Sequence, residues 1–188
     1  ALPVPRPETA HRMAVARVTA ADSPVVRLDF LTWQELAQEL TQHRPGRKDG
    51  PGWMPAEIQP GPRKGDRVRH VSALALDVEA QAERLQVGTK RLTGPTPPPL
   101  SAMASELDLW GLAAVLATSH SHLEPAAGGG TVGPRYRVTI KLSRPIAAQE
   151  VRPLALYVAA RLGVSESVDT SCMEPARLFY LPRCPADR

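Results

Sequence analysis

Two carboxylates stand one residue apart at the end of a short apolar run. The run 74–76 leads directly into Asp77, and Glu79 follows after one further apolar residue. In a β-strand alternate side chains lie on the same face, so the two acids would project together. Acids beside a buried strand are costly unless a cation neutralises them, and oxygen ligands suit Mg²⁺ or Mn²⁺. The pattern favours either a divalent-metal site or a strand that ends in a solvated acidic turn.

Two histidines follow a second apolar segment. Residues 113–121 have the pattern of a buried strand, and by alternation Thr118, His120 and His122 would share one face. Histidine at the end of a strand can hydrogen-bond a phosphate or bind a metal. The alternative is a pair of ordinary surface histidines.

Arginines open a third alternating segment, residues 135–142. Arg135 and Arg137 would lie on one face, and Lys141 and Arg144 follow them. The forked guanidinium suits phosphate oxygens, so the row predicts either a phosphate contact or a solvated basic strand face. Further on, Asp169 is typical of a turn or helix N-cap, but it could also supply a third carboxylate to a two-metal site.

The elements that must position these residues alternate between strands and helices. A helix is expected after Thr32, with Glu35 completing a capping box, and a second over residues 101–110. Residues 148–162 have the clearest helical spacing, with Pro153 in the tolerated first turn and Gly163 at the end. Residues 177–181 predict a last strand. Because residues 125–133 resemble a hairpin-like loop, the second and third strands should be antiparallel, which favours an antiparallel-rich mixed sheet of the α+β class covered by helices.

Composition is that of a globular protein with a basic balance. The 188 residues are 43% hydrophobic and carry a formal net charge of +4, and no apolar run approaches a membrane span. Residues 1–10 are Pro-rich and read as a flexible lead-in. Cys172 and Cys184 lack zinc-ligand spacing and fit reduced thiols of a cytoplasmic protein. The start without Met and the abrupt end indicate a catalytic domain of a longer protein.

The stretch 43–70 is rich in Gly, Pro and basic residues and is expected to be a long loop. It is either a solvated basic loop or a grip on the backbone of nucleic acid. The residues assigned to DNA binding are Arg47, Lys48, Arg63, Lys64, Arg67 and Arg69.

Taken in order, four segments resemble one known family. They read LALDVE, ATSHSH, PRYRVTIKLSRPI and VDTSCMEPARLFYLPR. The set is similar to the archaeo-eukaryotic primase superfamily, specifically the primase-polymerase domains of plasmid and phage replication proteins. By this resemblance Asp77 and Glu79 match the first acidic motif and Asp169 the third. The middle motif falls on Thr118-Ser119-His120, with Thr where the family has Ser, and His122 competes for the same role.

The resemblance implies an RRM-like catalytic core over about residues 71–183, flanked by helices, after an N-terminal αβ part over about 11–70. It implies template-directed nucleotidyl transfer with nucleoside triphosphates as substrate and single-stranded DNA as template. Two Mg²⁺ or Mn²⁺ ions would be held by Asp77, Glu79 and Asp169. A helicase domain or a replicative helicase would be a further partner. The triphosphate would be bound by His120 or His122 with Arg135, Arg137, Arg144 and Arg177.

Two other functions compete with this interpretation. The pair His120 and His122, with Tyr157 on the later helix, resembles rolling-circle nickases, in which two histidines hold a metal and a tyrosine attacks DNA. That interpretation leaves Asp77 and Glu79 unexplained. A non-catalytic module that binds single-stranded nucleic acid is the other alternative, although the aromatic content of 4% argues against a stacking platform.

Overall fold

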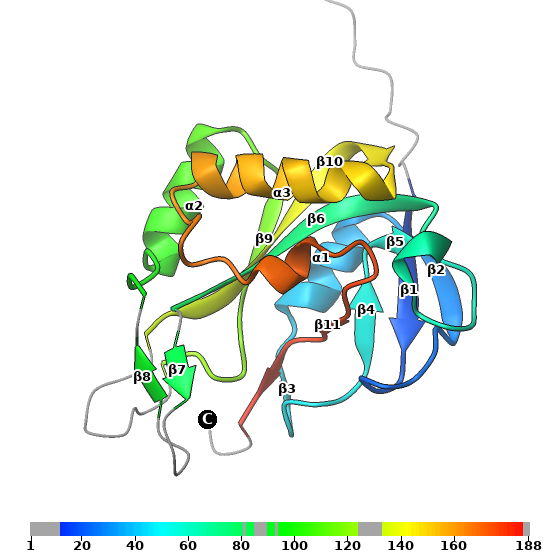
Figure 1. Ribbon diagram of the computed structural model, residues 1–188, viewed down its shortest axis with the longest axis horizontal. Helices are drawn as coiled ribbons and strands as arrows, with labels where there is room; N and C mark the ends of the chain where they lie inside the picture. The colour runs from blue at the N-terminus through cyan, green and yellow to red at the C-terminus, as the bar shows by residue number, and fades with distance from the viewer. Residues whose placement is uncertain (1–11, 81, 85–89, 93, 124–132, 186–188) are drawn as a thin grey trace, which may run out of the picture.

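The computed structural model describes residues 12–80, 82–84, 90–92, 94–123 and 133–185. Two four-stranded sheets lie side by side, and helices cover them (Figure 1). The predicted α+β class with antiparallel-rich sheets is confirmed. In the described part of the chain, no helix combines the length and the apolar character that a membrane span requires.

The first sheet has the strand order β11-β4-β1-β2. Its members are β1 (Met13–Val18), β2 (Arg27–Leu31), β4 (Gly52–Met54) and β11 (Phe179–Tyr180), and all of its pairings are antiparallel. Helix α1 (Trp33–Thr41) follows β2 and begins with the predicted capping box between Thr32 and Glu35. A C-terminal strand therefore completes a sheet that the N-terminal part begins.

The second sheet, with the order β5-β6-β10-β9, carries the segments with candidate chemistry. It consists of β5 (Ala56–Glu57), β6 (His70–Glu79), β9 (Ala114–Thr118) and β10 (Arg135–Ile146). Strand β10 is central and antiparallel to both β6 and β9, as predicted for the second and third strands. Helix α2 (Leu100–Leu109) links β6 to β9, and α3 (Ala148–Arg161) follows β10.

This order is that of an RRM-like unit. Strand, helix, two strands and helix follow in sequence, with the third strand between the first two. The edge of β6 that faces away from β10 pairs with β5 where β6 begins and, near its end, with Val168 through a single antiparallel bridge to Val78. Buried Val151, Ala155 and Ala159 form the inner side of α3, which packs on β6.

Short elements join the two sheets to their surroundings. Strands β3 (Arg44–Pro45) and β12 (Arg183–Cys184) pair in parallel, and β7 (Ala82–Arg84) pairs with β8 (Lys90–Leu92). The 3₁₀ turns are η1 (Gly65–Arg67) and η2 (Thr170–Met173).

Two predicted segments differ from the structure. The stretch 43–70 is not a long loop, because it contains β3, β4, β5 and η1 and buries Trp53 completely. The expected strand over residues 113–121 ends at Thr118, where the chain turns. The lead-in over residues 1–10 and nearly all of the loop over residues 125–133 lie outside the described residues.

Candidate functional site

The acid pair lies where β6 ends. Asp77 and Glu79 are partly exposed. Leu76, which precedes Asp77, and Val78, which lies between the two acids, are buried, so the predicted alternation of side chains between the two faces holds. Directly opposite on β10 stand Arg137, which faces Asp77, and Arg135, which faces Glu79. The two acids and the two arginines therefore occupy one face of neighbouring strands.

Each acid is neutralised by the arginine opposite it. Arg137 donates from Nε to Asp77 Oδ1 at 2.7 Å and from Nη2 to Oδ2 at 3.2 Å. Arg135 Nη1 lies 3.2 Å from Glu79 Oε2, and the Arg135 residue is 6% exposed. In this structure the positive charges that stabilise the two partly buried carboxylates thus come from arginines of the neighbouring strand.

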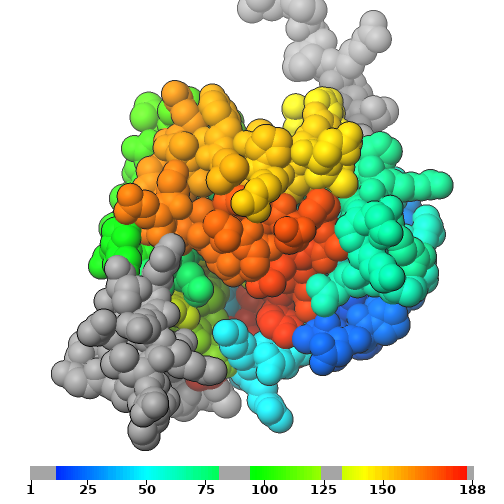
Figure 2. Space-filling view, viewed as in Figure 1, coloured from blue at the N-terminus to red at the C-terminus, as the bar shows by residue number. Residues whose placement is uncertain are grey.

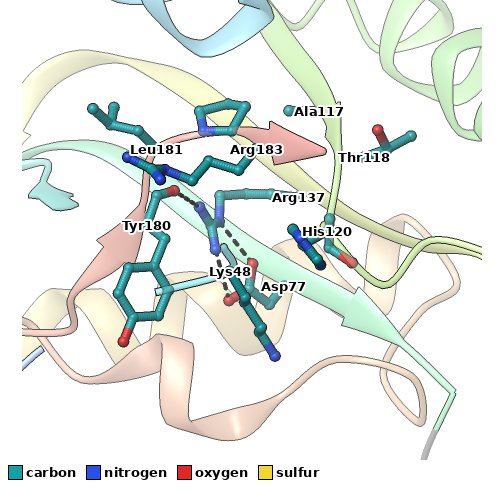
Figure 3. A pocket seen from close by; sticks show the side chains of 11 residues that line it. Lys48, Asp77, Ala117, Thr118, His120, Arg137, Tyr180, Leu181 and Arg183 are labelled. Carbon is teal, nitrogen blue, oxygen red and sulfur yellow. Dashed lines mark hydrogen bonds and ion pairs between the residues drawn. The ribbon is translucent and has the colours of Figure 1, made fainter. Parts of the chain in front are cut away.

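Arg137 also ties the two sheets together. Its Nη1 donates to the carbonyl of Tyr180 at 2.9 Å, and its guanidinium lies 4.6 Å from the ring centroid of Phe179. Both partners belong to β11 of the first sheet, and Figure 3 shows the guanidinium between Asp77 and the Tyr180 carbonyl. These three contacts fix the orientation of the Arg137 side chain, and its forked hydrogen bonds in turn fix the orientation of the Asp77 carboxylate.

Asp169 is brought beside the acid pair by backbone pairing. Its N–H donates to the carbonyl of Asp77 at 2.9 Å, next to the bridge between Val78 and Val168. The carboxylate accepts from the backbone and hydroxyl of Ser171, as the predicted N-cap role requires, and lies 3.6 Å from Arg177 Nη2. Asp169 thus caps the 3₁₀ turn η2 and also lies next to Asp77.

The three carboxylates line one cavity of about 190 Å³. Three arginines and one lysine line it with them: Arg135, Arg137, Arg177 and Lys48. Carboxylate oxygens are the donors that Mg²⁺ or Mn²⁺ prefers, so the donor types fit a divalent ion. Within the described residues, however, no three His, Cys, Asp or Glu side chains are close enough together to hold one.

A second, smaller cavity of about 70 Å³ shares Asp77, Arg137 and Lys48 with the first (Figure 3). Its other walls come from the end of β9, including His120, and from residues 180–183. Because they share these lining residues, the two cavities lie next to each other at the Asp77–Arg137 pair, and together they are called the hollow below.

The two histidines do not share a strand face, which corrects the prediction. Because β9 ends at Thr118, His120 and His122 lie in a turn and point to different partners. His120 Nε2 lies 3.1 Å from the carbonyl of Gly46 and its residue lines the smaller cavity. His122 Nδ1 instead contacts the backbone of Arg135, accepting from its N–H at 3.1 Å. Of the two candidates, only His120 lines a cavity with Asp77.

Several predicted residues lie elsewhere. Arg144 is exposed, forms an ion pair with Glu150 and lines neither cavity. Tyr157, the nucleophile of the nickase alternative, is 62% exposed on α3 and also lines neither cavity. The structure therefore brings Tyr157 into no common site with His120.

The basic residues of the stretch 43–70 fall into two groups. Lys48 lines both cavities, and Arg47 is its exposed neighbour. By contrast, the arginines of residues 63–69 contact the protein itself. Arg63 donates to the carbonyls of Ala21 and Ala176, Arg67 donates to those of Pro60 and Pro62, and Arg69 pairs with Glu57.

Sequence reasoning missed the contribution of β11 and β12. Phe179, Tyr180 and Arg183 belong to the walls of the hollow or hold its residues in place. Arg137, the partner of Phe179 and Tyr180, is more than forty residues away in sequence, so no local spacing indicates the contact.

Cys172 lies close to the acids, but its thiol is unreactive. Burial raises the pKa of its thiol to about 11, so the thiol stays protonated at neutral pH. A protonated, buried thiol is a poor nucleophile.

Comparisons with known proteins place this site in context. Residues 99–188 match the family model of the VapE N-terminal domain. Among curated proteins none matches the chain significantly. A solved structure of the archaeo-eukaryotic primase (AEP) domain of the primase-polymerase from cyanophage S-2L is similar with a TM-score of 0.40 and 16% identity. That similarity covers 94% of this chain and 75% of the other.

Proposed function

From the premise that residues 99–188 match the VapE N-terminal domain, we propose that this chain is a template-directed nucleotidyltransferase of the primase-polymerase type. Nucleoside triphosphates are its substrates and single-stranded DNA is its template. Replication of a phage, plasmid or other mobile element, in the cytoplasm of the host cell, is the setting in which such a domain works.

The observation that carries the proposal is the meeting of Asp77, Glu79 and Asp169 in one cavity that is also lined by cations. Asp77 and Glu79 are neighbours on β6, but Asp169 arrives from a segment ninety residues later through its hydrogen bond to the Asp77 backbone. A solvated acidic turn at the end of β6 would not need this third carboxylate.

Asp77, Glu79 and Asp169 are the residues that would hold divalent ions, and they would have to lie closer together than they do in this structure to bind one jointly. When bound, such ions would supply activation of the attacking hydroxyl and stabilisation of the leaving pyrophosphate. Arg137 and Arg135 hold Asp77 and Glu79 in fixed orientations before substrate arrives. His120, on the wall of the smaller cavity, is placed to contact the triphosphate, so the histidine role is assigned to His120 rather than His122.

Two arginines also have a buried Nε donor that is unused. In the described part of the chain, Arg135 Nε and Arg177 Nε have no hydrogen-bond partner, and both residues line the larger cavity. A buried donor without an acceptor is costly. Phosphate oxygens would supply acceptors and add a charge-assisted interaction, which supports a phosphorylated substrate.

Nucleotide incorporation on single-stranded templates tests the proposal. Purified protein should extend or initiate a strand with Mg²⁺ or Mn²⁺ and lose the activity in chelator. Variants D77A and D169A should keep the fold, as measured by circular dichroism, and lose incorporation. Full activity of both variants would refute the carboxylate assignment, and metal-independent DNA binding without incorporation would favour the non-catalytic module. Parallel reactions with ribo- and deoxynucleotides, primed and unprimed, would identify the substrate.

A further inference from the structure

We infer that the segment 44–48 is the surface that holds the phosphate backbone of single-stranded nucleic acid as it enters the hollow. The cations concerned are Arg44, Arg47 and Lys48. The inference extends the proposed function by locating its template, and it divides the basic residues of the stretch 43–70 into two groups with different tasks.

The three cations are exposed and available. In the part of the chain that the structure describes, the side chains of Arg44, Arg47 and Lys48 form no hydrogen bond and no ion pair. The segment contains no acid, and Asp49 follows it. A cluster of unpaired positive charges is the electrostatic footprint of a polyanion site.

The segment is anchored on both sides, so its cations are presented from a defined backbone. Strand β3 pairs with β12, which places Arg44 beside Arg183. The Gly46 N–H donates to the carbonyl of Cys184 at 3.0 Å, and the Gly46 carbonyl lies 3.1 Å from His120 Nε2. Residues from two distant parts of the chain, β12 and the turn with His120, thus fix this one segment.

Two glycines let the segment close around the Arg183 guanidinium. Gly46 has φ +145°, and a Cβ built there would lie 3.0 Å from Arg183 Nη1. A Cβ on Gly50 would also lie 3.0 Å from the same guanidinium. Arg183 Nη1 donates to the carbonyl of Arg47 at 3.4 Å. Arg183 therefore supports the segment from inside, while Arg44, Arg47 and Lys48 remain free on its outside.

The position of the segment identifies the ligand. Lys48 lines both cavities beside Asp77, so the segment reaches the acids at its Lys48 end. Figure 2 shows the cyan region around β3 projecting from the lower edge of the molecule as a narrow strip. Three cations on one short segment, the last of which lines both cavities, suit the phosphate backbone of a single strand.

The second group of basic residues, 63–69, contrasts with this arrangement. Its arginines donate hydrogen bonds to protein carbonyls or pair with Glu57, and none of its basic residues lines either cavity. It therefore offers a control with the same number of charges: the triple variant K64Q/R67Q/R69Q loses three cations, as R44Q/R47Q/K48Q does.

The test is equilibrium binding of a fluorescent oligothymidylate, without nucleotide, over a series of salt concentrations. Each lost phosphate contact should reduce the slope of log K against log salt by about 0.7, so R44Q/R47Q/K48Q should lower it by about 2. Its affinity at low salt should fall about tenfold or more. The control variant should keep the slope and affinity of the unmodified protein.

Equal losses in both variants, or a loss confined to K64Q/R67Q/R69Q, would overturn the inference, because net charge or the other group would then explain binding. Thermal unfolding of both variants shows whether each remains folded at the temperature of the assay. Binding requires no catalysis, so the outcome is independent of the proposed function. A protein that incorporates nucleotides but binds DNA equally well in both variants would retain the function and lose this surface.

Discussion

Arginine–carboxylate clusters occur in two regions of this molecule, one on each sheet. On the first sheet, Arg17 of β1 bonds Asp29 of β2 at 2.9 Å and Glu39 of α1 at 2.6 Å. On the second, Arg137 bonds Asp77 with the same forked geometry. Both arginines are largely buried, so the pairing itself does not distinguish the two regions.

The surroundings of the pairs do distinguish them. On the first sheet, Arg17 and Arg27 face two acids, and the cluster lines neither cavity described above. Around the larger cavity, four cationic residues face three carboxylates. A balanced, closed cluster fastens a helix to a sheet, whereas an open cluster with excess positive charge has capacity for an anionic ligand.

The largest expected effect comes from replacing one acid in each cluster by its amide. Asp77→Asn should reduce nucleotide incorporation about 10³-fold or more, because it removes a carboxylate that the proposed function places at the reacting groups. Asp29→Asn should leave incorporation per folded molecule unchanged. Initial rates at saturating nucleotide, normalised to folded protein, measure both. Comparable losses of activity in the two variants would erase the distinction between the clusters.

A smaller effect is expected when each arginine becomes lysine. A lysine keeps the charge but cannot make the forked contact, so Arg137→Lys should leave Asp77 less well oriented. We expect kcat to fall about tenfold while the KM for nucleotide changes less than about threefold, because Arg137 acts through Asp77 and not on substrate.

The matched variant is Arg17→Lys, which should lower the free energy of unfolding by about 1 to 2 kcal/mol and leave kcat unchanged. A large rise in nucleotide KM for Arg137→Lys would instead return Arg137 to the nucleotide-binding role that the sequence suggested.

Local patterns in the sequence predicted much of the second sheet. The alternation in β6, the antiparallel course of β10 and the spacing in α3 depend on residues close together in the chain. The capping box at Thr32 is similarly local. The placement of Asp77 and Glu79 on one face followed from the strand alone.

The parts of the fold and site that were not predicted depend on contacts between residues far apart in the sequence. The turn after Thr118 is stabilised by contacts of His120 with Gly46 and of Ser119 with Arg135, so the two histidines separate for reasons outside their own segment. Burial of Trp53 in β4 likewise depends on pairing with β1 and β11. The strands within the stretch 43–70 were therefore not predictable from the stretch itself. The cross-strand pairing of acids with arginines could be read only once the register of β6 and β10 was known.

The smallest effect concerns pH and again sharpens the contrast between the clusters. Burial alone would raise the pKa of Asp29, but hydrogen bonds from Arg27 and Arg17 outweigh it, and the pKa lies below its ordinary value of 3.8. A carboxyl whose pKa is lowered by folding binds fewer protons in the folded state than in the unfolded one. Its contribution to stability is therefore complete above the ordinary pKa and is lost as the pH falls through the lowered value.

Asp29→Asn should accordingly be less stable than the unmodified protein near pH 7, and the difference should shrink as the pH falls below about 4. Urea unfolding across this range measures the two curves, with Asp22→Asn, an exposed aspartate without an ion pair in the described residues, as the control. Convergence specific to Asp29→Asn would show that the closed cluster contributes stability through its charges. Parallel curves would mean that Arg17 holds the first sheet through packing of its side chain, and the comparison with Arg137 would then rest on geometry alone.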